Sequence, residues 1–378
     1  MEQRRYAYID AVRGYAILLV IAVHSSLCCP NLGPLVRKIA DQGARGVQLF
    51  FVASALTLCL SWSARNDGAR PFYIRRFFRI APMFYLGLVF FVCWVGVGRG
   101  IYAPDGVGLR HILMALTFTH GLMPDTITSE VPGSWSIADE AIFYLIFPLL
   151  VTSLNRVNFG YATVAVAIVT FLAAQIQGRA WGYAATVTDP AWGANLGMFF
   201  GLWFVHQLPC FLFGILAFKW ITECRPVRWP RTLVVGALVA AIWLAFYPPG
   251  PIGLPVYFGM VFALFVLGLS QWQPRALINP VICWIGKVSY SAYLVHFALL
   301  SSVTIPNSNY LEAFAVLTSL TIAISSITYF CVEEPGNKLG RYVIRKLQEA
   351  DYRGSLSRTE PAPLAERGLV GFDRGSPS

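Results

Sequence analysis

The chain contains ten apolar stretches, most of them close to 20 residues long, separated by short polar loops. A helix of about 20 apolar residues crosses about 30 Å of hydrocarbon, so runs of this length predict membrane spans. Only 13% of the 378 residues are charged, and the mean hydropathy is +0.59. This composition excludes a water-soluble globule, a disordered chain and a disulfide scaffold. The predicted fold class is all-α, a polytopic membrane helical bundle of about ten transmembrane helices.

The predicted spans lie near residues 9–27, 46–63, 79–98, 135–154, 161–177, 198–219, 232–247, 253–270, 279–302 and 311–333. An eleventh stretch, 110–123, is shorter and holds two His, which predicts a re-entrant or partly buried helix. The eight Cys have no CxxC pair and no zinc-like spacing, so no metal site is expected. We expect no cleaved signal peptide and no second folded domain. The predicted domain covers residues 1–345, and a disordered cytoplasmic tail covers 346–378.

The Lys and Arg residues in the loops predict the orientation of the chain. With the N-terminus in the cytoplasm and ten crossings, the inner side of the first 336 residues holds thirteen of them and the outer side six. Cytoplasmic loops are enriched in Lys and Arg, so both termini are predicted to be cytoplasmic. The net charge of +10 then reflects topology and attraction to an anionic leaflet, and nucleic acid is not an expected partner.

The first predicted span carries ionisable residues that are costly inside a membrane. Arg13 and His24 are eleven residues apart, which places them on one helix face about 16 Å apart along the axis. Asp10, one turn before Arg13, can pair with it. Ionisable residues within a membrane span are expected to have an ionic or hydrogen-bonding partner or a functional role. The alternative is that Asp10 and Arg13 lie at the cytoplasmic boundary while His24 makes an ordinary hydrogen bond.

Three further groups of polar residues lie in or beside later spans. Arg75, Arg76 and Arg79 form a fork suited to phosphate, although composition alone favours an ordinary positive-inside flank. Ser136, Glu140 and Tyr144 form a stripe that suits acid/base chemistry or a structural ion pair. Lys287, Ser289, Tyr290, Tyr293 and His296 lie on the ninth span, where His296 contacts substrate or is an ordinary core residue. Helix arithmetic places His24, Glu140 and His296 in one outer layer, and Arg13, Arg76, Arg79 and Lys287 in the inner half.

The chain resembles the acyltransferase family 3 membrane proteins through four motifs in order. These are D-x-x-R-G with R-x10-H (Asp10, Arg13, Gly14, His24), R-x-x-R (Arg76, Arg79), W-S-x-x-x-E-x-x-F-Y (Trp135, Ser136, Glu140, Phe143, Tyr144) and S-Y-x-x-Y-L-x-H (Ser289 to His296). Glu333, Glu334 and Pro335 also resemble the family's ending. The resemblance covers residues 6 to 345. Many members of the family also carry an SGNH esterase-like domain, and the chain resembles the stand-alone members without it.

The resemblance implies a bacterial inner-membrane O-acyltransferase that takes an acyl group from cytoplasmic acyl-CoA, with acetyl-CoA the first choice. The acceptor is then a hydroxyl of a glycan, a lipid-linked saccharide or a glycosylated small molecule at or near the outer face. We expect the lipid bilayer as surroundings and leave a homo-oligomer open. A secondary transporter or flippase for an anionic solute is the alternative, because it also places Arg, His and Glu along a path.

The mechanism that we predict assigns roles to each motif. The catalytic residues are His24 as the base, Glu140 as its orienting carboxylate and Arg13 beside the donor's path. The donor-binding residues are Arg75, Arg76, Arg79 and Lys287. The residues predicted to bind substrate are Trp135, Ser136, Tyr144, Tyr293 and His296.

Overall fold

The computed structural model describes residues 6–29, 31–98, 106–128, 130–248, 250, 253–302 and 309–359. These residues form helices and connecting turns, without a strand among them. The α-helices are α2 (Ala7–Ser25), α3 (Pro34–Asp41), α4 (Gly46–Arg65), α5 (Ala69–Phe90), α6 (Leu109–Leu116), α7 (Trp135–Asn155), α8 (Phe159–Thr186), α9 (Pro190–Leu202), α10 (Phe204–Glu223), α11 (Pro230–Phe246), α12 (Leu254–Gln271), α13 (Pro280–Lys287), α14 (Ser289–Ser302), α15 (Tyr310–Thr328) and α16 (Glu334–Thr359). Shorter 3-10 or π segments are η1 (Ser26–Cys28), η2 (Gln42–Arg45), η3 (Phe91–Val95), η4 (His120–Leu122) and η6 (Tyr329–Glu333).

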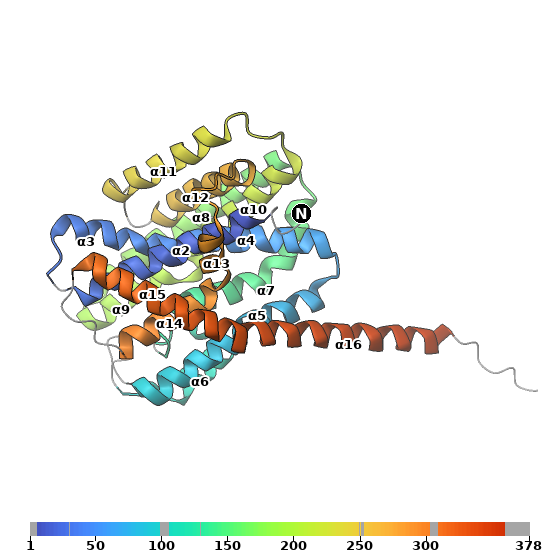
Figure 1. Ribbon diagram of the computed structural model, residues 1–378, viewed down its shortest axis with the longest axis horizontal. Coiled ribbons are helices and arrows are strands. Elements are labelled where there is room, and N and C mark those ends of the chain that lie inside the picture. The colour runs from blue at the N-terminus through green and yellow to red at the C-terminus, as the bar shows by residue number, and fades with distance from the viewer. Residues whose placement is uncertain are drawn as a thin grey trace, which may run out of the picture.

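The helices form the multi-pass membrane bundle that the sequence predicts (Figure 1). Eight helical segments in the described part of the chain are long and apolar enough to cross a membrane. The bent pair of α13 and α14 is a ninth, and α11 is a shorter apolar helix of 17 residues. Together they overlap all ten predicted stretches. The short stretch 110–123 forms α6 and η4, and its re-entrance stays a prediction.

Helix α2 is the central helix of the bundle. It packs against α4, α12, α13, α14 and α15, and the side chains of Ala11, Val12, Ala16 and Ile17 are fully buried. Small and branched apolar side chains on several faces suit a helix surrounded by other helices. This position lets α2 present different side chains to different neighbours, which matters for the sites described below.

The predicted ninth span is broken rather than straight. Helices α13 and α14 meet at Val288 with a bend of 73°. Gly286 packs directly on the backbone carbonyl of Asp10, and a Cβ atom at that position would overlap it. The missing side chain therefore lets α13 lie against the start of α2, while α14 leaves in another direction. A continuous helix over 279–302 was expected, because its apolar composition carries no sign of the bend.

The segment that precedes α7 is buried inside the bundle. Ile127 and Val131 are fully buried, and Thr126, Glu130 and Ser134 are buried as well. Backbone in such a place needs internal hydrogen bonds, and Gly133 supplies a carbonyl that accepts one from the hydroxyl of Tyr293 at 2.9 Å. Helix α7 therefore begins among buried residues of the protein.

Lys219 is a buried cation within α10. Its ammonium group donates to the carbonyl oxygens of Leu154 and Val157, each at 3.0 Å, and pairs with Glu223. Lys219 ends the predicted span 198–219 and is one of the thirteen Lys and Arg residues predicted on the inner side, and the structure buries it completely. Its donors satisfy carbonyls that the end of α7 leaves without intrahelical partners.

Helix α16 extends away from the bundle at the end where the described chain begins (Figure 1). It continues to Thr359, so residues 346–359, which were expected to lack regular structure, are helical. Pairs one turn apart, such as Lys338 with Glu334 and Arg345 with Glu349, support a solvated helix. The rest of the predicted tail lies outside the described residues, and the domain boundary at 345 stays a prediction.

Candidate active site

The arginines of α5 differ in their partners. Arg75 makes two hydrogen bonds to the carboxylate of Asp67, at 2.5 and 2.8 Å. These bonds hold the pKa of Asp67 below its usual value. Asp67 lies in the turn between α4 and α5, where Asn66 and Gly68 have positive φ angles of 46° and 83°. Arg75 was predicted to bind the donor, but it is occupied in holding this turn.

Arg79 pairs with Glu333 deep in the bundle. The side chain of Glu333 is fully buried, and its other oxygen accepts a hydrogen bond from Ser291 at 2.9 Å. The Arg79 guanidinium also lies 5.9 Å from the ring centroid of Tyr290. Sequence analysis noted Glu333 only as part of a terminal motif. The pairing of Glu333 could have been predicted from its place at the end of an apolar run, because a carboxylate there needs a cationic partner.

Arg13 and Arg76 are the cations of this region without a carboxylate partner. Neither forms an ion pair with an acidic side chain of the described residues. Arg76 lies over the ring of Phe72 at 5.6 Å, and its Nε atom is buried without a hydrogen bond. The predicted ion pair of Arg13 with Asp10 is not formed, although the two groups act on each other electrostatically. These two guanidinium groups are therefore available to an anion.

Two adjoining cavities connect the arginines with the polar stripe of α7. Each has a volume of about 60 Å³. Their shared walls are Arg13, Phe50, Glu140 and Tyr290. The first cavity extends to Arg76, Arg79 and Tyr144, and the second to Ser136, Ser289 and Tyr293. We call the two together the polar chamber. Its small volume means that side chains must move apart before a substrate arm can pass.

The second cavity ends at a chain of hydroxyl groups. Ser136 donates to the hydroxyl of Tyr293 at 2.9 Å, and Tyr293 donates to the carbonyl of Gly133 at the same distance. Trp135 packs edge-on against Phe51, with ring centroids 6.1 Å apart. Three of the residues predicted to bind substrate therefore lie together at this end. Tyr144 lies at the other end and donates to Glu140 at 2.9 Å.

His24 and His296 form a hydrogen-bonded pair next to Tyr293. The Nε2 atom of His296 lies 3.2 Å from Nδ1 of His24, and the centroid of the His296 ring lies 5.7 Å from that of Tyr293. Phe297 contacts both imidazoles, at centroid distances of 4.6 and 4.0 Å. His296 is fully buried, whereas His24 is half-buried. His24 is thus the more exposed member of the pair, although it does not itself line the polar chamber.

The backbone assigns the tautomers of the neutral pair. Nδ1 of His24 lies 2.9 Å from the carbonyl oxygen of Val20, and Nδ1 of His296 lies 3.1 Å from that of Ala292. A carbonyl oxygen only accepts, so both Nδ1 atoms carry the hydrogen. The single hydrogen on Nδ1 of His24 is then shared between the Val20 carbonyl and Nε2 of His296, and Nε2 of His24 keeps its lone pair. This arrangement leaves His24 with the nitrogen that a general base requires.

Two predicted roles change in the structure. Glu140 was expected to orient His24, but it lies in the polar chamber with Arg13, and the side chain that hydrogen-bonds to His24 is His296. Glu140 lies one turn further along α7 than Ser136, and it is Ser136 that reaches Tyr293 beside the imidazoles. His296, predicted to contact substrate, is buried behind His24.

Lys287 lies apart from the other predicted donor-binding residues. It is exposed at the bend between α13 and α14, with its ammonium 5.5 Å from the ring of Trp284 and 5.4 Å from that of Tyr329. It does not line the polar chamber. Within the described residues no three His, Cys, Asp or Glu side chains are grouped to hold a metal ion, and the lack of a metal stays a prediction.

The fold and this site define a multi-pass membrane protein with cationic and imidazole groups held inside its helical bundle. Residues 6–330 match the family model described as an acyltransferase domain, of the acyltransferase 3 type. The chain therefore belongs to this acyltransferase family.

Three curated relatives come from different bacterial genera. The chain is 27% identical to the acyltransferase MdmB of Streptomyces mycarofaciens, covering 78% of this chain and 79% of that protein. A putative O-acetyltransferase of Staphylococcus aureus is 26% identical, over 78% of this chain and 50% of its own length. The exopolysaccharide production protein ExoZ of Rhizobium meliloti is 27% identical, over 69% and 78%. No solved structure matches the chain.

Proposed function

We propose that this acyltransferase moves an acyl group, with acetyl the first choice, from cytoplasmic acyl-CoA to a hydroxyl of a carbohydrate or glycoside-type acceptor. The acceptor would be a glycan, a lipid-linked saccharide or a glycosylated small molecule at or near the outer face of the bacterial inner membrane. The observation that carries the proposal is the accessible imidazole of His24, whose Nε2 lone pair is fixed by the His296 contact. The available guanidinium groups of Arg13 and Arg76 support an anionic donor.

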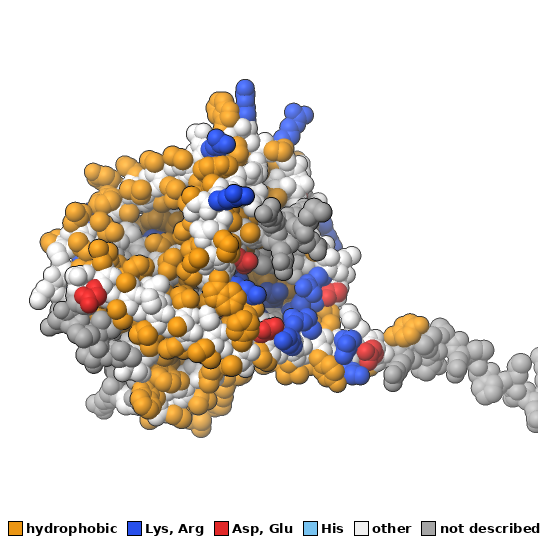
Figure 2. Space-filling view, in the orientation of Figure 1, with side chains coloured by type: hydrophobic (Ala, Val, Ile, Leu, Met, Phe, Trp, Pro, Cys, Tyr) orange, Lys and Arg blue, Asp and Glu red, His pale blue; other side chains and the backbone are white. Residues whose placement is uncertain are grey.

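The orientation in this proposal places α16 and the N-terminus in the cytoplasm. Both lie at the same end of the bundle in Figure 1. On the face shown in Figure 2, most of the visible Lys and Arg side chains gather toward that end, while apolar side chains cover the rest. An excess of basic residues is typical of the cytoplasmic side. Phosphates of the donor would then meet Arg76 first, with Arg79 and its Glu333 partner behind it.

The proposed reaction is a direct transfer between two substrates. Nε2 of His24 accepts the proton of the acceptor hydroxyl while the hydroxyl oxygen attacks the thioester carbonyl carbon. The bond from carbon to sulfur breaks, and the CoA thiolate takes the proton back from Nε2 of His24. While His24 is protonated, the lone pair of His296 accepts the hydrogen bond from its Nδ1. Glu140 and Arg13 line the path of the thioester arm.

The direct test is an assay of the purified protein in detergent. Acetyl-CoA and a panel of methyl glycosides are supplied, and both CoA thiol release and acetylated glycoside are measured. Glycoside-dependent release of CoA is the expected result. Failure to consume any acyl-CoA, combined with solute uptake in proteoliposomes, would instead establish a transporter.

The order of events is tested by omitting the acceptor. Direct transfer predicts no covalent intermediate, so mass spectrometry of protein incubated with acetyl-CoA alone should show His24 unmodified. An acetyl group on His24 that a glycoside then removes would replace direct transfer by a two-step reaction, with the same residue as the nucleophile.

A further inference from the structure

A second, larger cavity lies on the other face of α2. Its volume is about 540 Å³, within the range of small-molecule sites. The α2 residues that line it are Tyr15, Leu18, Leu19 and Ala22, which recur at helical spacing on one face. His24, Arg13 and their neighbours belong to the opposite side, toward the polar chamber. Helix α2 therefore separates two cavities of different character, and we call the larger one the apolar cavity.

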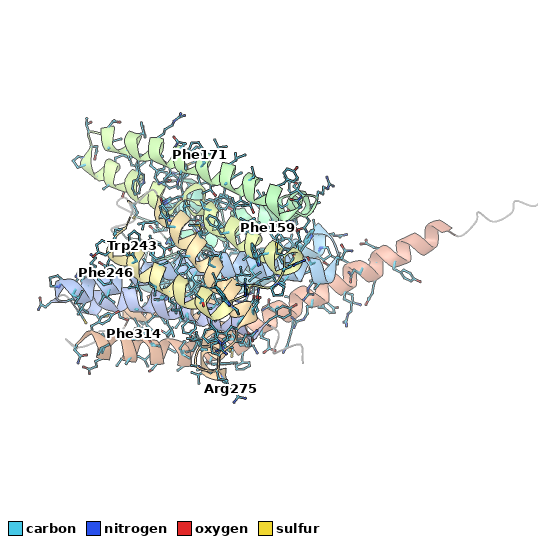
Figure 3. The ribbon with its side chains drawn as sticks, turned by 90° about the horizontal axis from the view of Figure 1, so that it is seen from above. Phe159, Phe171, Trp243, Phe246, Arg275 and Phe314 are labelled. Carbon is cyan, nitrogen blue, oxygen red and sulfur yellow. The ribbon has the colours of Figure 1, made fainter. Side chains whose placement is uncertain are left out.

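The apolar cavity has a buried floor and an open edge. Leu49, Phe258 and Phe262 of the lining are buried, whereas Ile39, Leu238 and Ile242 are exposed. In Figure 2 a hollow is visible in the apolar surface between the α11 edge and α2. Phe246 and Phe314 line it from α11 and α15, and Figure 3 shows both near the end of the bundle opposite α16. The open edge faces the zone that membrane lipid occupies around such a bundle.

Charged side chains occur at one place only in the lining. Lys38, Gln42 and Arg45 come from the consecutive segments α3 and η2. Lys38 donates to the carbonyl of Phe246 at 3.3 Å, and the Arg45 guanidinium lies 5.5 Å from the ring centroid of Phe258. The Nε atom of Arg45 is buried without a hydrogen-bond partner. No carboxylate lines the cavity, and within the described residues neither cation forms an ion pair.

The other polar groups of the lining are already bonded to backbone. Tyr15 donates to the carbonyl of Leu277 at 2.8 Å, and Tyr310 donates to that of Ala22 at 2.9 Å. They offer little to a polar ligand. A ligand matched to the cavity is therefore apolar along its length and negatively charged at one end.

We propose that the apolar cavity binds an anionic phospholipid of the membrane, with one hydrocarbon chain along α11 and α12 and the phosphate against Lys38 and Arg45. Burial of a chain along apolar walls removes it from water and fills the cavity. The phosphate satisfies two cations that have no acidic partner in the lining. A neutral lipid fills the same space but leaves both cations without an anion, so the charge pattern selects an anionic headgroup.

The site lies close to the candidate active site without belonging to it. Ala22 lines the apolar cavity, and His24 follows two residues later on the same helix. A lipid held here packs against the outer side of α2 along the turns that carry His24. The inference does not depend on acyl transfer, because its test measures bound lipid.

The test uses the full chain in nanodiscs that contain phosphatidylglycerol and phosphatidylcholine with the same acyl chains, in equal amounts. Native mass spectrometry then counts the lipids that stay bound. The expected result is one retained phosphatidylglycerol, favoured over phosphatidylcholine by about fivefold for each of the two cations. Ala241→Trp, which fills the cavity from α11, should remove the retained lipid. The double variant Lys38→Gln with Arg45→Gln should keep a lipid but lose the preference for the anionic one.

Matched controls use the other side of α11. Ala240, the neighbour of Ala241, lines a hollow of about 400 Å³ that adjoins the apolar cavity at Ala237 and Val261, and Ala240 itself does not line the apolar cavity. Arg228 lines the same hollow. Ala240→Trp and the double variant Arg228→Gln with Arg231→Gln should therefore bind lipid as the wild type does. Thermal unfolding in the same nanodiscs checks that every variant is folded.

Two outcomes would overturn the proposal. One is a failure of the lipid measurement to show a selective site, seen either as equal retention of the two lipids by the wild type or as unchanged retention by folded Ala241→Trp. The other is a dimer in the mass spectrum that Ala241→Trp converts to a monomer without loss of lipid, which would assign this face to a second copy of the chain.

Discussion

The two ends of the polar chamber use opposite electrostatics. At the α5 end, Arg79 pairs with Glu333 and Arg75 pairs with Asp67, while Arg76 has no acidic partner. Next to the Tyr293 end, His24 and His296 bond to each other and to backbone carbonyls, and no carboxylate of the described residues pairs with either imidazole. The α5 end therefore holds guanidinium and carboxylate groups with permanent charges. The imidazole pair next to the Tyr293 end keeps one lone pair that is not used within the pair, on Nε2 of His24.

This difference indicates that one end binds an anion and the other transfers a proton. Guanidinium groups stay charged at any physiological pH and can hold an anion, but they do not transfer protons. A neutral imidazole pair does the reverse, because it can take up and return a proton without a permanent charge. Variants at the two ends should therefore fail in different ways, and four substitutions examine this in order of expected effect.

His24→Ala should give the largest loss. Removing a general base lowers kcat by about 10² to 10⁴ fold, while donor affinity, which belongs to the other end, stays close to that of the wild type. Acceptor-dependent CoA release and equilibrium binding of CoA measure the two quantities. Ser25→Ala is the matched control, because that neighbouring hydroxyl bonds only to the carbonyl of Ile21. Wild-type turnover by the His24 variant would remove the base assignment.

Arg76→Gln should raise the KM for acyl-CoA with a smaller change in kcat. Loss of a hydrogen bond to a charged group corresponds to about 10 to 100 fold. Arg75→Gln is the comparison, because Arg75 is occupied by Asp67 and should change the KM much less. Steady-state kinetics with varied acyl-CoA provides the measurement. Equal effects of the two variants would show that both arginines serve only as a charged flank.

His296→Leu should lower kcat by about 2 to 10 fold, the effect of one neutral hydrogen bond, and leave both KM values unchanged. His296→Gln should restore most of the rate, because its side-chain oxygen can accept from Nδ1 of His24. A merely structural role for His296 predicts instead that the two variants lose activity in parallel with their thermal stability, which is measured alongside.

Asp67→Asn should have the smallest effect, and it should depend on pH. Arg75 lowers the folded-state pKa of Asp67, so the carboxylate stabilises the protein above its unfolded pKa of about 3.9. That stability is lost as the pH falls through the lower folded pKa. Thermal unfolding should therefore separate the wild type from the variant at pH 6, and the difference should vanish in strong acid. A difference that persists there would have another origin than the charge.

The sequence predicts the helices of this protein well because lipid imposes a simple requirement. Each apolar stretch had to be a helix, and all ten contain one. The bend at Val288 was not predicted, because it depends on the close packing of Gly286 against α2. The apolar sequence around it does not indicate this tertiary contact. The burial of Thr126, Glu130 and Ser134 also escaped prediction, because polar residues of this kind are typical of a surface loop.

The sequence predicts which residues form the site, but it does not predict which of these residues contact one another. Motif spacing selected His24, Arg13, Arg76 and Glu140, and three of these line the polar chamber. The contact of His24 with His296 joins residues 272 positions apart, so helix arithmetic could not find it. The predicted common layer for His24 and Glu140 rests on sequence distance from helix ends, which does not show that the residues before α7 are buried among other helices.

The hydrogen bonds at Gly133 have a consequence for how sequences of this kind can diverge. Ser136 and Tyr293 are tied to one another and to that carbonyl, so the start of α7 is anchored from within. Insertions and deletions between α5 and residue 126 can then reshape the approach for a new acceptor while leaving Ser136 and Glu140 in place. Changes in chain length after residue 126 would shift the stripe itself.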